Sequence, residues 1–355
     1  MPIVTTEHFK SGNLPLSKNG IPQVSEDDYC RLKGYMLETD DIVFSRVGSV
    51  DINAHVEHVQ QGWLFSGRVL RVRPIKSVNS LCLHYVLSTE SVKRDIRNRA
   101  VGQTMPSINT PILSNTGIYM SQSEAEQKKI ANLLSLIDER ISTQNKIIED
   151  LNKLKSAIIN YAINSLDTDF AKFGSLYEMA GEGGTPTTSN ASFYDNGKIP
   201  FIKIDDLKQK YLTENKDFIT ELGLQKSSAW LVPTHSILFS NGATIGEISI
   251  TTYPVCTKQG ILGIVPKQNI DVEFLYYFMS SSYFKKAVSR IVTEGTMKTA
   301  YLKDINNILC PIPTKEKQQE IAKMPSALNS KIDFEQSILK LFCSQKQYLL
   351  RQMFI

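Results

Sequence analysis

The chain has 355 residues, of which 41% are hydrophobic and 21% are charged, and this length exceeds what one hydrophobic core supports, so we expect two domains. A net charge of +4 permits nucleic-acid binding without requiring it. The apolar runs are too short to span a bilayer, the amino terminus does not read as a signal peptide, and the five cysteines include no pair at metal-ligand spacing. We therefore expect a cytoplasmic protein with reduced thiols and no membrane association.

The first 121 residues have a strand-rich pattern with a late helix. Ile42–Phe44 and Gly67–Val72 are short β-type runs. A break at Pro74 precedes a helix that we expect from about Ser80 to Arg99. This pattern predicts an α+β domain at residues 1–121.

Residues 122–166 carry a long helical pattern with heptad spacing of its apolar residues. A helix of about 42 residues, at ~1.5 Å per residue, is roughly 60 Å long, which is more than the width of a small domain. We call the predicted contact residues of this helix, and of a second helix described below, the seam. In the first helix the seam comprises Ile130, Leu134, Ile137, Ile141, Gln144, Ile148, Leu151 and Ile158.

Residues 167–312 repeat the pattern of the first domain. Three β-type runs occur at 236–240, 245–250 and 260–265, and a helix with Asp271 as its cap is expected from 271 to 290. This segment predicts a second α+β domain of similar fold.

Residues 313–355 carry a second long helical pattern that matches the first at a constant offset of 191. Glu126–Ala131 falls on Lys317–Ala322, and even a polar seam residue, Gln144, falls on another, Glu335. An interior Pro325 predicts a kink, or a helix that starts only near Ser326. The seam of this helix comprises Ile321, Leu328, Ile332, Glu335, Leu339, Phe342, Leu349 and Met353.

The chain is therefore a duplication of a domain followed by a long helix. The match extends into the domains, where Met1–Val4 faces Ile199–Ile202 and Gly67 faces Gly260, but the first domain lacks the lead-in equivalent to residues 169–198. The first helix leads to the second domain, from which the second helix starts. The seams can meet only if the second helix runs back, which predicts an antiparallel coiled coil with pseudo-twofold symmetry.

Catalytic motifs are missing from both repeats. The glycine-rich segment 181–185 has neither the spacing nor the lysine of a phosphate-binding loop. His55 and His58 are close together but have only Glu57 as a further ligand, so we interpret them as structural rather than metal-binding. A duplicated chain without a repeated acid, base or nucleophile is expected to bind rather than to catalyse.

The order of short motifs is similar in both halves and resembles one family. Gly184–Pro186 precedes Asn196–Ile202, then Gly295–Met297, and then Pro311–Pro313 leading into Gln318–Ile321. In this order, ahead of a long helix, the chain resembles the DNA-specificity subunit of type I restriction-modification enzymes. The resemblance covers nearly the whole chain.

This resemblance implies a non-catalytic subunit that reads a split double-stranded DNA target, one half-site per domain. It implies two methyltransferase (modification) subunits and further motor-nuclease (restriction) subunits as partners. The methyl donor and the nucleotide would be bound by those partners, so no cofactor is expected on this chain. An alternative function is a coiled-coil scaffold that organises protein partners without DNA specificity, and exposed charges on the helices fit either docking or simple solvation.

Basic residues end the late helix of each domain, and polar residues follow in a turn. Such side chains suit contacts with phosphates and base edges, although the carboxyl end of any helix favours basic residues. Two residues that follow a matched Phe-Ser pair are further candidates. The DNA-binding candidates are Arg46, Arg94, Arg97, Arg99, Gln103, Thr104, Asn241, Lys285, Lys286, Arg290, Thr296 and Lys298.

Overall fold

The computed structural model describes residues 1–292 and 298–354, and the chain divides into two compact units. Unit 1 comprises Met1–Lys146 and Ser337–Ile355, and unit 2 comprises Ile147–Gln336. Each unit therefore contains one globular part and one stretch of each long helix. Both units combine helices with small sheets, which confirms the predicted α+β class.

Unit 1 is built on an antiparallel sheet with the strand order β3-β2-β5. A second, two-stranded sheet is formed by β1 and β4, which pair in parallel. The strands are β1 (Ile3–Val4), β2 (Ile42–Ser45), β3 (Asn53–His55), β4 (Leu64–Phe65) and β5 (Val69–Val72). The helices are η1 (Thr6–Phe9), α1 (Glu26–Arg31), η2 (Lys33–Tyr35), η3 (His58–Gln60), α2 (Ser80–Leu87), α3 (Glu90–Arg99) and α4 (Thr110–Ser114).

Alternation along β2 gives unit 1 a core on each face of this sheet. Phe44 packs with Val86 and Ile96 of the helical layer, whereas Val43 belongs to a second cluster that contains Phe9 and Trp63. Both sides of the sheet are therefore covered, which explains why every residue of β2 is buried.

Unit 2 contains a five-stranded sheet with the order β7-β14-β11-β12-β9, and two smaller sheets, β10-β8-β13 and β15-β6. The strands are β6 (Phe170–Lys172), β7 (Tyr177–Glu182), β8 (Ile199–Ile202), β9 (Tyr211–Leu212), β10 (Asp217–Ile219), β11 (Ile237–Ser240), β12 (Ile248–Thr251), β13 (Cys256–Thr257), β14 (Ile261–Pro266) and β15 (Leu309–Pro311). The helices are η4 (Phe173–Ser175), η5 (Ala191–Phe193), η6 (Ile204–Asp206), α6 (Glu221–Gln225), α7 (Val272–Ser280), α8 (Ser282–Ile291) and α9 (Leu302–Ile305).

The two units repeat one structural motif. In each, a hairpin (β2–β3 or β11–β12) pairs with a third strand (β5 or β14), and two helices follow. Ser45 pairs with Val69 and Ser240 pairs with Ile261, so Gly260 matches Arg68. The sequence match of Gly260 with Gly67 was therefore wrong by one residue.

In unit 2, the segment 169–198 supplies β7. This strand pairs with β14 along the sheet edge, whereas β5 has β2 as its only strand partner among the residues described in unit 1. The sheet of unit 1 is correspondingly narrower.

Each late helix is divided in two, whereas the sequence predicted a single helix. Thr89 is extended between α2 and α3, and Ser281 is extended between α7 and α8. The Ser281 side chain accepts a hydrogen bond from the Phe284 amide and so begins a new helix. Apolar periodicity continues through such a break, which is why the sequence pattern did not reveal it.

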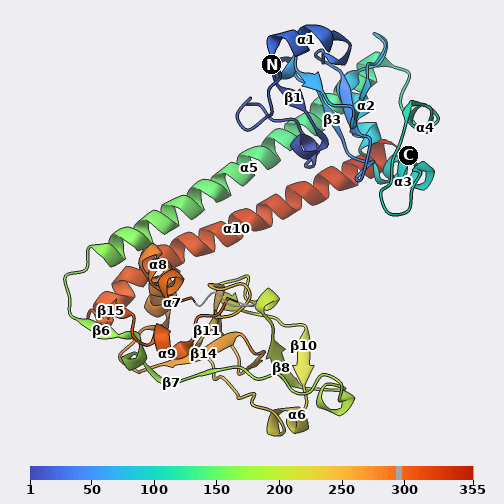
Figure 1. The fold of residues 1–355 in the computed structure, drawn as a ribbon. Helices are drawn as coiled ribbons and strands as arrows, with labels where there is room; N and C mark the ends of the chain where they lie inside the picture. The colour runs from blue at the N-terminus through green and yellow to red at the C-terminus, as the bar shows by residue number, and fades with distance from the viewer. Residues whose placement is uncertain (293–297, 355) are drawn as a thin grey trace. The chain divides into compact units, whose positions relative to one another are not determined.

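Two long helices, α5 (Glu124–Asn164) and α10 (Lys315–Met353), run antiparallel and side by side in both units (Figure 1). In unit 1, Asp138 lies 2.5 Å from Lys346, and Arg140 covers the Phe342 ring. In unit 2, Lys155 donates to Asn329 at 3.1 Å. The antiparallel pairing expected from the sequence is confirmed, and none of the predicted seam residues is exposed.

Helix α10 passes through Pro325 without a break, so the expected start near Ser326 was wrong. Packing offsets the lost backbone hydrogen bond. Pro325 is buried, and the adjacent Ser326 hydroxyl lies 3.0 Å from the Lys210 ammonium and donates to Glu273 at 3.0 Å. Because Lys210 also pairs with Glu273, this network fixes the turn at Pro325 against the globular part of unit 2.

A buried glutamine joins the start of each long helix to its own globular part. The Gln127 amide accepts a hydrogen bond from the Asn79 N–H at 2.7 Å and donates to the Ser121 carbonyl at 2.8 Å. Gln318 makes the equivalent bonds, accepting from the Asp271 N–H and donating to the Pro313 carbonyl. We call these two residues the glutamine clamps.

Candidate nucleic-acid interface

In unit 1, two loops are bonded together at the end of β2. The Arg46 carbonyl accepts from the Ile108 N–H at 2.9 Å, and the Gly48 N–H donates to the Pro106 carbonyl at 2.8 Å. A groove of about 360 Å³ opens there, which we call groove 1. It is lined by Arg46, Val47, Gly67, Val101, Ser107, Ile108, Asn109 and Ile112.

The loop after α3 turns sharply at Gly102. Its φ angle is 103°, and a Cβ atom there would lie 2.8 Å from the Met105 carbonyl oxygen, so only glycine fits. This turn leaves Gln103 and Thr104 exposed at the loop tip. Both side chains are thus accessible to a ligand.

The four arginine candidates of unit 1 differ in their partners. Arg97 forms ion pairs with Asp51 and Glu90, and Arg99 pairs with Asp95 in its own helix. The Arg46 guanidinium donates to the Gly67 carbonyl at 3.3 Å, and neither it nor the exposed Arg94 has an ion pair among the described residues. Arg46 and Arg94 are therefore more available to an anionic ligand than the other two.

Unit 2 has a larger groove at the matching end of its sheet, which we call groove 2. It has a volume of about 590 Å³ and brings together Lys285 of α8 and Lys298. Glu247 lines the same groove, so its charge is mixed. Lys286 and Arg290 are exposed on α8 outside the groove lining, and Thr296 lies outside the described residues.

One arginine of unit 1 is replaced in unit 2 at the position where groove 2 lies. Buried Val92 and Ile96 of α3 correspond to buried Phe284 and Val288 of α8, which places Ser289 at the position of Arg97. In the hairpin turn, Asp51 corresponds to Gly246. The ion pair between helix and turn in unit 1 therefore has no equivalent at Ser289 and Gly246, and both of these residues line groove 2.

Asn241 is not on the surface. Its side chain is 1% exposed and donates to the Ala300 carbonyl at 3.2 Å, and the backbone carbonyl of Asn241 accepts from the Ala300 N–H. The prediction that Asn241 contacts DNA is therefore corrected. Its hydrogen bonds with Ala300 hold the loop before α9 against β11. Its counterpart, Arg46, is exposed at the same place in the repeat.

Sequence reasoning missed Arg68, which is exposed at the start of β5 and whose carbonyl accepts from the Arg46 N–H. The available signal for Arg68 was that a basic residue comes directly before a β-type run. In the sheet this residue lies close to the matched Phe-Ser pair. The register error between Gly67 and Gly260 obscured it.

The described residues offer no cluster of three or more metal-ligating side chains. His55 lies 3.2 Å from Asp40, and burial lowers its pKa, while His58 is exposed in η3. None of the helices in the described ranges has the length and apolar character required to span a membrane.

Several known proteins match the chain. The proposed specificity subunit of the type I restriction enzyme MjaX from Methanocaldococcus jannaschii is 26% identical over 367 residues, covering 94% of this chain and 81% of the relative. The MjaIX specificity subunit of the same organism is 32% identical over 173 residues, covering 47% of this chain and 39% of the relative.

Two solved structures share the fold. The type I restriction-modification S subunit from M. genitalium aligns with a TM-score of 0.57 and 18% identity, covering 90% of this chain and 84% of that one. A chain from a study of assembly and conformational transition in the type I system aligns with a TM-score of 0.59 and 14% identity, covering 90% and 82%. The family model described as the type I restriction modification DNA specificity domain matches residues 1–153 and 167–341, and this chain therefore belongs to that family.

Proposed function

We propose that this chain is the non-catalytic specificity subunit of a type I restriction-modification complex and reads a bipartite DNA target, one half-site per globular part. The observation that carries this proposal is that the DNA specificity domain matches the chain twice, once over each repeat. Basic residues at the same end of the repeated sheet in both units support it.

In this function, grooves 1 and 2 and their rims face the duplex. Arg46, Arg94, Lys285 and Lys298 would bind phosphates, because these cations have no ion pair among the described residues. The loop tips that carry Gln103, Thr104 and Thr296 would reach base edges, since amide and hydroxyl groups can read the donors and acceptors of the major groove.

We further propose that α5 and α10 set the distance between the two half-sites. Helices of 41 and 39 residues are about 60 Å long, compared with about 34 Å for one turn of DNA. A helix pair resists bending more than a flexible linker does, so the gap between half-sites would be fixed.

Exposed apolar side chains on the long helices support docking of methyltransferase subunits there. In unit 1, Leu136 is 57% exposed and Leu341 is 68% exposed, alongside Leu133 and Tyr348. A helix face that served only solvation would not need these residues. The methyl donor would be bound by these partners, and restriction subunits would join the same complex.

The test is to express the chain with its methyltransferase subunit and to map methylated adenines across the host DNA. A motif in two parts, separated by a constant number of unspecified base pairs, is expected. Methylation in one continuous motif, or a motif that is unchanged when this chain is replaced by another family member, would contradict the proposal.

A further inference from the structure

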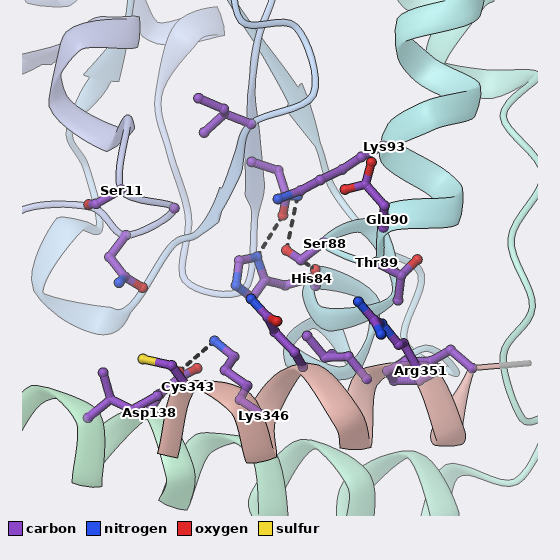
Figure 2. A pocket seen from close by; sticks show the side chains of 18 of the residues that line it. Ser11, His84, Ser88, Thr89, Glu90, Lys93, Asp138, Cys343, Lys346 and Arg351 are labelled. Carbon is purple, nitrogen blue, oxygen red and sulfur yellow. Dashed lines mark hydrogen bonds and ion pairs between the residues drawn. The ribbon is translucent and has the colours of Figure 1, made fainter. Parts of the chain in front are cut away.

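Unit 1 contains a second cavity, which shares no lining residue with groove 1 and brings several cationic groups together with Glu90, the partner of Arg97 (Figure 2). It has a volume of about 940 Å³ and lies among the loop at 10–13, the start of α3 and the last turns of α10. Lys346 at its edge is paired with Asp138. Lys93 and Arg351 also line it, and neither has an ion pair among the described residues.

The amino terminus of α3 opens onto this cavity without a side-chain cap. The Thr89 hydroxyl donates to the Val86 carbonyl at 2.7 Å instead of accepting from the first turn. The Ser91 and Val92 amides consequently have no acceptor among the described residues. Free amides at a helix start carry partial positive charge and favour an anion.

Unit 2 closes the equivalent place with its own side chains. Ser281 caps α8, and the Asn160 side chain accepts from the Ser282 amide at 2.8 Å. The constant helix offset places Arg351 at the position of Asn160. Unit 1 therefore has a cation where unit 2 has an acceptor, so its helix terminus is open to an external acceptor.

A buried histidine adds a hydrogen-bond acceptor to the same cavity. His84 is 8% exposed, and the hydrogen bonds around it fix its tautomer. Ser88 Oγ donates to the His84 carbonyl at 2.9 Å and so accepts from Asn53 Nδ2, which leaves Asn53 Oδ1 to accept from His84 Nδ1 at 2.6 Å. His84 Nε2 therefore carries a lone pair, and it has no partner among the described residues.

We propose that this cavity, which we call the phosphate pocket, binds a phosphate group that can carry a P–O–H proton, either inorganic phosphate or the monoester phosphate of a mononucleotide. Its charged oxygens bind the α3 amides, Lys93 and Arg351, and its P–O–H group donates to His84 Nε2. A phosphodiester of DNA has no such proton and would leave Nε2 unpaired. Because the second ionisation of a phosphate monoester has a pKa of about 6, the protonated oxygen is present near neutral pH.

Burial keeps the histidine in the required form. It lowers the pKa of His84 to about 3, so Nε2 remains an acceptor. Figure 2 shows Lys93 approaching from α3 and Arg351 rising from α10, with His84 between the two helices.

Titration calorimetry of the full chain with inorganic phosphate and with sulfate, at about pH 6 and about pH 8, tests the pocket. Sulfate matches phosphate in size but has no proton to donate. Phosphate is expected to bind about tenfold more tightly than sulfate at the lower pH, and this preference should shrink at the higher pH. Equal affinities at both pH values, or no binding of phosphate, would overturn the proposal.

Variants assign the binding to this cavity. Arg351→Gln is expected to weaken phosphate binding about tenfold, whereas Lys340→Gln, at an exposed position on the same helix, should leave it unchanged. Displacement by a mononucleotide but not by duplex DNA is expected, and the reverse would assign the site to the DNA backbone. Adenine methylation patterns measured on the same variants report the proposed function separately, so either idea can fail alone.

Discussion

At the scale of single residues, unit 2 has Ser289, which lines groove 2, where unit 1 has Arg97. In unit 1 the guanidinium neutralises Asp51 and Glu90, whereas groove 2 retains Lys285 and Lys298 without ion pairs among the described residues. Cations without protein partners give the larger gain when they meet a phosphate, because no existing ion pair must break. Lys285 and Lys298 are therefore expected to contribute more to DNA affinity than Arg97 does.

Replacing Lys298 or Lys285 by alanine is expected to weaken binding to all DNA sequences alike and to reduce the slope of log affinity against log salt by about 1 for each lysine. The measurement is a salt titration of DNA binding by the chain with its methyltransferase subunit. Lys267→Ala, at the opposite end of β14, is the matched control. A changed recognition motif with an unchanged salt slope would contradict a phosphate role.

His84 gives unit 1 a stability that depends on pH. Its folded pKa of about 3 is below the usual value of ~6.5, so the unfolded chain binds a proton first as the pH falls. This stability is complete above about pH 6.5 and is lost progressively toward pH 3. Between about pH 7 and pH 5 the free energy of unfolding should fall by about 2 kcal/mol from this group.

Urea unfolding in phosphate-free buffer checks this expectation, with Trp63 fluorescence reporting unit 1 in a Trp230→Phe background. The variant His84→Gln should lose that part of the pH dependence, and His58→Gln, which alters an exposed ring, should retain it. An identical pH profile for all three chains would exclude His84 as the source.

Residue identity alone did not determine which candidates are accessible. Arg46 and Asn241 both follow a Phe-Ser pair at the end of a repeated strand, and both were predicted as DNA contacts. Asn241 is buried because Ala300, distant in sequence, folds over it. Such contacts depend on a loop whose position no local pattern encodes.

At the scale of elements, the long helices were the best predicted part of the fold. Heptad spacing depends on neighbouring residues, so it indicated the long helices α5 and α10 directly. The pattern failed at two places where side chains override it. Ser281 begins a new helix, and the network of Lys210 and Glu273 keeps Pro325 within α10. The short strand β3 and the parallel pair β1 and β4 were missed because each has only two or three residues.

The glutamine clamps predict a large effect from one substitution. Gln127→Leu would leave the Asn79 N–H and the Ser121 carbonyl unpaired in a buried setting, at a cost of about 2 kcal/mol in the free energy of unfolding. Lys129→Leu, at an exposed position nearby, should change it little. Urea unfolding followed through Trp63 provides the measurement, and equal midpoints for the two variants would show that the clamp does not contribute.

At the scale of the whole molecule, the proposed spacing function can be tested by lengthening both helices together. The boundary between the units crosses α5 after Lys146 and α10 before Ser337. Adding one heptad at each point keeps the seam in phase and lengthens each helix by about 10 Å, which corresponds to about three base pairs.

The mapped methylation motif should then keep both half-sites and gain about three unspecified base pairs between them. A heptad added to α5 alone should instead abolish bipartite methylation, because the two seams no longer match. An unchanged gap in the doubly extended chain would disprove the spacing role.

The division of the chain also dictates the order in which its parts can mature during translation. Unit 2 is contiguous and has all its residues once Gln336 has been synthesised. Unit 1 was begun first, yet Phe354 packs against its core and Lys346 pairs with its Asp138. The amino-terminal part of unit 1 therefore lacks these two contacts until Lys346 and Phe354 have been synthesised.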